Sequence, residues 1–90
     1  MSEGYESRPF ESRIINGYVS GNTGETGILN PSTPIPTSDI KIISAWAIGS
    51  FIVIPMMAQS DQTWRFVILN TNLQKQTNAS IEVYYTGMYV

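Results

Sequence analysis

The sequence predicts an all-β fold: a small antiparallel β-sandwich, jelly-roll-like, with an extended N-terminal arm. Short runs rich in β-branched and aromatic residues alternate with clusters of Gly, Pro, Asn and Ser, which is typical of strands joined by turns. No segment places apolar residues at positions i, i+3, i+4 and i+7 over three turns, so no amphipathic helix is expected. Short strands with frequent turn signals favour a sandwich or a small barrel.

The N-terminal arm is predicted from the uneven distribution of charge along the chain. Of the twelve charged residues (five Lys and Arg, seven Asp and Glu), five lie in the first thirteen positions. Gly4 and Pro9 discourage a regular helix or strand there. A chain of 90 residues provides for one compact domain. The change in charge near residue 13 therefore divides it into an extended arm at residues 1–13 and a β-sandwich domain at residues 14–90.

The first half of this domain is expected to alternate short strands with flexible connections. Ile14–Gly21 is a β run in which Gly17 is a candidate bulge. Gly21–Gly27 is a glycine-rich loop, and a very short strand begins at Ile28. The connector that follows contains three prolines, which cannot sit in a central strand, so it forms an edge or crosses between sheets: Pro31, Pro34 and Pro36.

Two further strands form a candidate hairpin. Ile40–Trp46 and Ser50–Met56 flank the tripeptide Ala-Ile-Gly, a possible tight connection. Pro55 either ends the second strand or places it at the edge of a sheet.

The last two predicted strands alternate between apolar and more polar positions. Thr63–Asn70 has its most apolar side chains on one face, at Trp64, Phe66 and Ile68. A polar connector follows. Ser80–Val90 closes the domain, with one apolar face at Ile81, Val83 and Tyr85.

Apolar residues on both faces of some strands predict association between subunits. Nothing from Phe51 to Pro55 is polar, whereas a two-sheet sandwich buries only one face of each sheet. The chain has neither Cys nor His, so disulfides and the commonest metal ligands cannot stabilise its small core. A second copy of the chain is the simplest cover for the remaining apolar face, with Phe51 and Ile52 in the oligomer contact.

The sequence offers little of the chemistry that catalysis requires. A carboxylate pair for glycoside hydrolysis would have to come from four acids that no local motif joins: Glu25, Asp39, Asp61 and Glu82. A serine nucleophile would lack a histidine base, and the loop "GNTGETG" lacks the lysine of a phosphate-binding loop. We therefore expect a protein without enzymatic activity, with no catalytic residue, no metal site and no cofactor.

Charge and hydropathy argue against two kinds of partner. The net charge is −2 and the five cations are dispersed, whereas a nucleic-acid binder should carry a basic stripe. The longest apolar-rich stretch, Ile43–Ala58, is interrupted by Ser, Gly and Pro and is too short to cross a bilayer. The opening residues lack the basic and apolar regions of a signal peptide. We expect no nucleic acid partner, no membrane insertion and synthesis in a cytoplasm.

The aromatic residues allow two interpretations. Trp46, Trp64, Tyr84 and Tyr85 could form a platform on which a sugar ring stacks, or they could belong to the core. Trp64 lies on the apolar face of its strand and is expected to be a core anchor. Trp46 precedes a turn, so it is either a core residue or a contact to a glycan.

Five short motifs in order resemble a recurring pattern in virion proteins of tailed bacteriophages. The motifs are "GYVSGN", "IISAW", "IVIP", "TWRFVILN" and "SIEVYYTG", and they extend from Gly17 to Gly87. Similar modules occur at the ends of tail fibres, in receptor-binding proteins of the baseplate and in fibres attached to heads. The resemblance implies a β-sandwich that is usually a homotrimer and often binds glycans or proteins of the host surface.

This resemblance, taken with the arm, gives a functional expectation. Only about thirteen residues precede the domain, so no fibre shaft is expected, and the chain would be a small non-enzymatic virion subunit of the head-fibre, decoration or tail accessory type. It would be located in the virion and dock on capsid or tail proteins through arm residues Tyr5, Arg8, Pro9 and Phe10. The alternative is a receptor-binding module that recognises host carbohydrate, with Trp46 as a contact.

Overall fold

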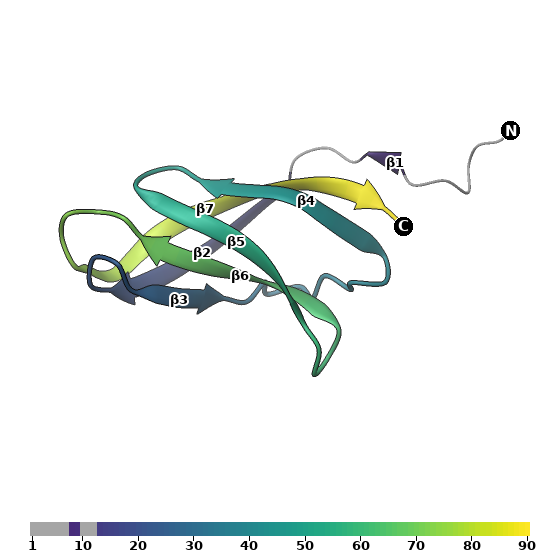
Figure 1. Ribbon diagram of the computed structural model, residues 1–90, viewed down its shortest axis with the longest axis horizontal. Coiled ribbons are helices and arrows are strands. Elements are labelled where there is room, and N and C mark those ends of the chain that lie inside the picture. The colour runs from purple at the N-terminus through teal and green to yellow at the C-terminus, as the bar shows by residue number, and fades with distance from the viewer. Residues whose placement is uncertain (1–7, 10–12) are drawn as a thin grey trace, which may run out of the picture.

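The computed structural model describes residues 8–9 and 13–90, and this part of the chain consists of strands and their connections (Figure 1). The seven strands in these residues are β1 (Arg8–Pro9), β2 (Arg13–Gly21), β3 (Thr26–Leu29), β4 (Ile40–Ala47), β5 (Phe51–Ala58), β6 (Thr63–Asn70) and β7 (Gln76–Tyr89). They form two packed antiparallel sheets, which confirms the predicted all-β sandwich. Within the described residues there is no helix of the length and apolarity needed to span a membrane.

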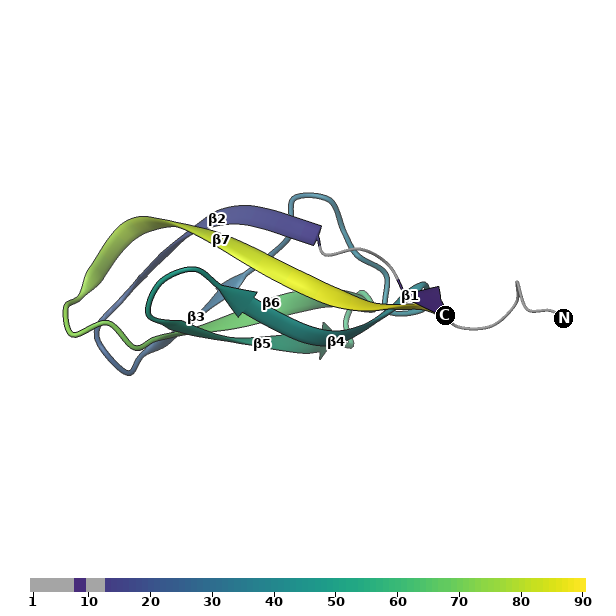
Figure 2. The same cartoon turned by 90° about the horizontal axis from the view of Figure 1, so that it is seen from above.

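Sheet A is built around the long strand β7. Val83 of β7 is paired with Ile15 of β2 and also with Ala47 of β4, so β2 and β4 must lie on opposite edges of β7, as Figure 2 shows. The short strand β1 pairs with the end of β7, where Arg8 is opposite Tyr89. Sheet B has β6 at its centre, between β3 and β5.

The chain passes repeatedly from one sheet to the other. The predicted hairpin between Ile40–Trp46 and Ser50–Met56 is wrong, because β4 pairs with β7 in sheet A whereas β5 pairs with β6 in sheet B. The link at residues 48–50 turns at Gly49, whose φ is +104°, and sends the chain into the opposite layer. This crossing lets β4 and β5 face one another across the core. Pro55 lies in β5, at an edge of sheet B as expected.

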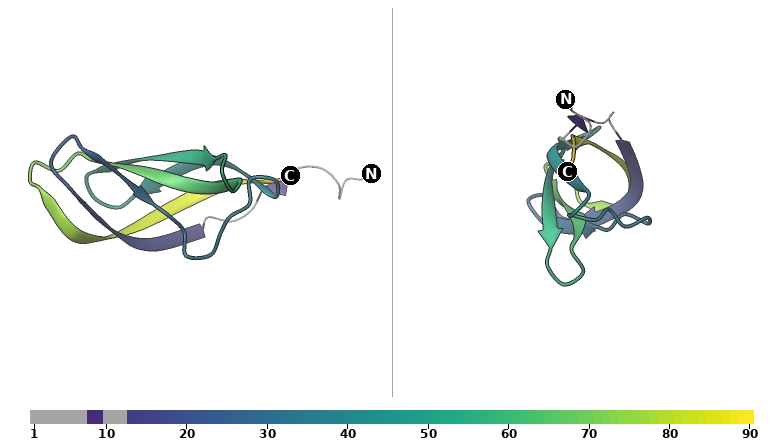
Figure 3. Two further views of the ribbon diagram at one scale, coloured as in Figure 1. Left: turned by 90° about the horizontal axis from the view of Figure 1, so that it is seen from below. Right: turned by 90° about the vertical axis from the view of Figure 1, so that its right-hand side faces the viewer.

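The core lies between the inner faces of the two sheets, which surround a common interior when viewed along the long axis (Figure 3). Phe66 in β6 and Val83 in β7 are fully buried at the centres of the two sheets. The rings of Phe66 and Tyr85 have centroids 5.6 Å apart. Trp64 is only 6% exposed, and its Nε1–H donates to the Ile40 carbonyl over 2.9 Å. The prediction that Trp64 belongs to the core is therefore confirmed.

Two glycines in the strands mark places where a side chain does not fit. Gly17 is paired in register with Ile81, so it is not the predicted bulge, and the irregularity of β2 lies between Val19 and Gly21. A Cβ on Gly17 would occupy the space of the Leu29 side chain, so Gly17 allows sheet B to approach. Gly87 is buried where the backbone of β4 comes close, near the register shift between Ile42 and Ser44.

The close approach at Gly87 gives a stability prediction. A Cβ at this position would lie 2.9 Å from the Ile42 Cα and still closer to the Lys41 carbonyl oxygen. Because these atoms belong to the backbone, β4 itself would have to move. Gly87→Ala should lower the free energy of unfolding by about 1–3 kcal/mol, the usual cost of overpacking, measured by urea denaturation.

Gly27 provides a matched control in β3. Its nearest neighbour in the structure would be 4.0 Å from an added Cβ, at the Ser20 carbonyl oxygen. Gly27→Ala should leave stability nearly unchanged. If the two alanine variants unfold at the same urea concentration, the close backbone contact at Gly87 does not affect the free energy of unfolding.

Candidate functional site

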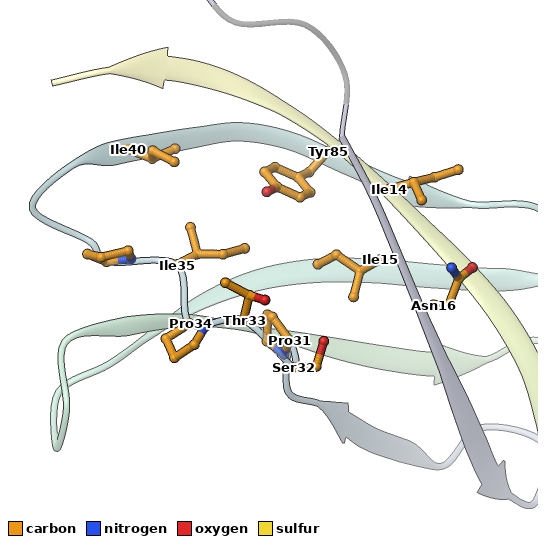
Figure 4. Close-up of a pocket in the computed structure, with 11 residues that line it drawn as sticks. Ile14, Ile15, Asn16, Pro31, Ser32, Thr33, Pro34, Ile35, Ile40 and Tyr85 are labelled. Atoms are coloured by element: carbon orange, nitrogen blue, oxygen red, sulfur yellow. The ribbon is translucent and has the colours of Figure 1, made fainter.

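A pocket of about 370 Å³ opens between the start of β2, the proline-rich connector and the start of β4 (Figure 4). Its walls are mostly aliphatic, prolyl and aromatic: Ile14, Ile15, Pro31, Pro34, Ile35, Pro36, Ile40 and Tyr85. Asn16, Ser32 and Thr33 are the polar residues of the lining. No carboxylate or amine is among these described lining residues, which offer apolar contact and hydrogen bonding.

The outer face of sheet A carries a row of large side chains across three strands. Ile14 of β2, Tyr84 of β7 and Trp46 of β4 are successive partners in register. The Trp46 and Tyr84 rings are parallel within 8°, with centroids 6.0 Å apart. We call this ring pair the aromatic platform. Trp46 is 42% exposed, so the interpretation of Trp46 as a core residue is wrong.

The local backbone explains why Trp46 faces outward. Ala45 and Ala47, its neighbours in β4, pack against the core, and side chains alternate between the two faces of a strand. Ile42 is also buried, although strict alternation from Ile42 would put Trp46 inside. The register shift between Ile42 and Ser44 inserts an extra residue and reverses the phase of the alternation.

The platform has a carboxylate beside it. The Tyr84 hydroxyl donates to Glu82 Oε1 over 3.1 Å. This hydrogen bond, together with desolvation and the negative charge of Glu82, raises the pKa of the Tyr84 hydroxyl above its ordinary value. The hydroxyl therefore remains a neutral donor at physiological pH. Asn16 lies opposite Glu82 on β2, and Ser44 lies opposite Thr86 on the other side of the platform.

The outer face of sheet B is aliphatic. Alternation turns five aliphatic side chains outward on its three strands, and we call this group the aliphatic face: Ile28, Ile52, Ile54, Val67 and Leu69. The first three are 56%, 50% and 53% exposed. Two cross-strand rows connect the group, namely Ile28–Val67–Ile54 and Thr26–Leu69–Ile52. These residues form a continuous uncharged surface.

The two residues predicted for the oligomer contact lie on opposite sides of β5. Ile52 belongs to the aliphatic face, whereas Phe51 is partly buried and packs against the core. The structure therefore brings Ile52, but not Phe51, together with other exposed aliphatic residues. That either residue contacts another subunit stays a prediction.

The predicted attachment residues are only partly described. Arg8 and Pro9 form β1 and are paired through their backbones with Tyr89 and Met88. Tyr5 and Phe10 lie outside the described residues. Attachment through the arm therefore stays a prediction.

One buried polar residue organises the end of the sandwich at which three connections meet (Figure 1). The Asn70 side chain donates to the carbonyls of Gly21 and Gln74 over 3.1 and 3.3 Å, and its Oδ1 accepts two 2.8 Å hydrogen bonds from Asn72. Asn72 in turn donates to the Ser50 carbonyl. No role is predicted for Asn70 from the sequence, although a polar residue at an inward position of "TWRFVILN" is a signal of such a network.

Each of the four candidate acids makes a local hydrogen bond of its own. Glu25 caps a turn by accepting from the Asn22 N–H, and Asp61 is paired with Arg65 over 3.1 Å. A hydrogen bond from Thr63 is the main cause that lowers the pKa of Asp61, and Arg65 adds to it. Within residues 8–9 and 13–90, no three metal-ligating side chains come together.

The comparisons with known proteins found no family model, no curated protein and no solved structure that matches this chain.

Proposed function

We propose that the chain is a non-enzymatic structural subunit of a multi-copy protein assembly, in which copies associate through the aliphatic face of sheet B. The observation that carries this proposal is the exposure of Ile28, Ile52 and Ile54 in a continuous patch with Val67 and Leu69. Contiguous apolar patches of this kind mark interaction sites on soluble proteins. The resemblance to virion modules favours a bacteriophage virion as the assembly, a homotrimer as its unit and the N-terminal arm as the attachment to other virion proteins.

The energy available at the aliphatic face supports association. Full burial of an Ile, Leu or Val side chain contributes about 1.5–3 kcal/mol, and the three isoleucines have about half of their surface still exposed. Covering the face therefore contributes on the order of 1 kcal/mol per side chain. A contact that covers the three isoleucines on two copies therefore gains roughly 6 kcal/mol, which lies within the range of about 4–15 kcal/mol or more that one association costs in lost motion.

The edge strand β5 and the charged border of sheet B favour a contact through the face of the sheet. β5 is an edge strand, and Pro55 within it has no N–H to donate to a further strand. Among the described residues of β3, β5 and β6, the charged side chain is that of Arg65, which lies at the border of the face and is paired with Asp61. Copies that pack through the face would therefore not bury a charge.

The test is the mass of the protein in solution. We expect light scattering of the wild type to give about three times the 10.0 kDa of one chain. Ile54 is 53% exposed on the aliphatic face, so Ile54→Asp should shift the protein to monomers that retain the β-type circular dichroism spectrum. The reason is that burying an unpaired carboxylate in the contact is costly.

Ile43 is the matched control, since it is 61% exposed but lies in β4 of sheet A. Ile43→Asp should leave the oligomer intact. A wild type that is monomeric at micromolar concentration would refute association through this face, and so would equal dissociation by both substitutions.

A further inference from the structure

We propose that the aromatic platform of Trp46 and Tyr84 on the outer face of sheet A binds a neutral pyranose ring of an oligosaccharide. This surface belongs to the sheet opposite the aliphatic face. The inference therefore goes beyond the proposed assembly function and does not depend on it.

The ring geometry leaves a flat aromatic surface available. Parallel rings in van der Waals contact are about 3.5–4 Å apart, whereas the Trp46 and Tyr84 centroids are 6.0 Å apart. The rings are therefore offset, and each leaves part of its face uncovered by the other. The exposed fraction of Trp46 is 42%. The faces of aromatic rings are electron-rich, so they attract the C–H groups that form one face of a pyranose.

Hydrogen-bonding groups lie on both sides of the platform along the strands. Glu82 and Asn16 are paired two residues from Tyr84 in one direction, and Thr86 and Ser44 are paired two residues away in the other. A carboxylate can accept more hydrogen bonds than the one that Glu82 receives from Tyr84. An aromatic floor with hydroxyl, amide and carboxylate groups along its margins matches a ligand that has an apolar face and a ring of hydroxyls.

The charge at the platform selects among ligands that could stack there. Glu82 carries the only charge in the described cross-strand rows of the platform and its two flanking pairs. A carboxylate repels sialic and uronic acids, which also carry carboxylates. Nucleic acid bases stack on aromatic residues as well, but they come with phosphates and need a positively charged groove. Neutral hexoses and N-acetylhexosamines are therefore the expected ligands.

The experiment is an array of paired neutral and acidic oligosaccharides, probed with the full chain, followed by fluorescence titration with the tightest neutral ligand. Trp46 is exposed and Trp64 is buried, so a ligand on the platform should change mainly the Trp46 emission. We expect neutral glycans to bind at least tenfold more tightly than their acidic counterparts. Trp46→Ala should weaken binding at least tenfold.

Two further variants make the test specific. Tyr18 is 67% exposed on the same sheet face but lies in a different cross-strand row, opposite Ser80, so Tyr18→Ala should bind normally. Glu82→Gln should reduce the ratio of the affinity for neutral glycans to the affinity for acidic glycans. The proposal is overturned by an array on which no neutral glycan binds, by equal binding of neutral and acidic glycans, or by unchanged affinity in folded Trp46→Ala. These readouts do not depend on the oligomeric mass, so they can fail while the assembly proposal stands.

Discussion

Trp64→Ala should lower the free energy of unfolding by about 3–5 kcal/mol, which is the usual cost of truncating a buried tryptophan. Trp64 is 6% exposed in the core cluster between the two sheets. Its indole N–H also donates to the carbonyl of Ile40, the first residue of β4. The substitution therefore opens a cavity and leaves this carbonyl without its side-chain donor.

The effect is large relative to the stability that a domain of this size can have. At roughly 0.05–0.15 kcal/mol per residue, a chain of 90 residues is stable by only about 5–13 kcal/mol. The melting temperature of Trp64→Ala should therefore fall by roughly 12 °C or more. Thermal and urea denaturation followed by circular dichroism would measure both quantities.

The second tryptophan supplies the control. Trp46 is 42% exposed on the outer face of sheet A, so Trp46→Ala should cost far less stability, on the order of 1 kcal/mol or below. If Trp46→Ala and Trp64→Ala destabilise the protein equally, the assignment of Trp64 as the core anchor is wrong.

The inner faces of the central strands could be predicted because apolar and more polar residues alternate along these segments of the sequence. Trp64, Phe66 and Ile68 of β6 are buried, as the pattern of "TWRFVILN" indicated. The same holds for Ile81, Val83 and Tyr85 of β7. These central strands have a neighbour on each side. Their regular pairing preserves the two-residue period along these segments.

The pairing partners could not be predicted, because they depend on contacts between distant residues. The Ala-Ile-Gly link is compatible both with a hairpin and with a crossing to the other sheet, and in the structure β4 pairs with β7 whereas β5 pairs with β6. β7 also begins at Gln76, earlier than the predicted Ser80. Its polar first residues are held by β2, where Gln76 is paired with Gly21.

The aromatic platform could not be predicted, because it depends on a register shift in β4 for which the sequence contains no signal. The register shift between Ile42 and Ser44 reverses the alternation of β4, and this brings Trp46 to the surface beside Tyr84. The two aromatic residues are 38 positions apart in the chain (84 − 46 = 38). Only the antiparallel pairing of β4 with β7 makes them neighbours.

Asn70→Ala should lower the free energy of unfolding by about 2–4 kcal/mol, because it removes four hydrogen bonds of a buried side chain at once. The Asn70 side chain makes four hydrogen bonds, two donated to Gly21 and Gln74 and two accepted from Asn72. Each polar group that is left buried and unpaired costs about 1–3 kcal/mol, and water can replace part of this loss at a loop end.

The loss should also be local, since Asn70 connects the two loops that flank it. Its backbone N–H donates to Glu25, and its carbonyl accepts from Gly24, so these hydrogen bonds do not depend on the side chain. The link at residues 71–75 is held to Gly21 through the Asn70 amide, and to Thr23 through a 2.6 Å hydrogen bond that Thr23 Oγ1 donates to the Asn72 carbonyl. In Asn70→Ala, amide hydrogen exchange should accelerate most in this link, and less at the centre of β6.

Asn30→Ala is the matched control, because Asn30 is exposed in the connector after β3, and its removal should change stability by no more than about 0.5 kcal/mol. Urea denaturation of the two variants compares them directly. Equal stability of Asn70→Ala and Asn30→Ala would mean that water fully replaces the amide. In that case the fixed geometry of the loop end would come from the remaining hydrogen bonds, namely those of the backbone and the one that Thr23 Oγ1 donates. If Asn70→Ala is the less stable variant, as the buried position and the four hydrogen bonds indicate, then the side chain of the last residue of "TWRFVILN" is required to order this end of the sandwich.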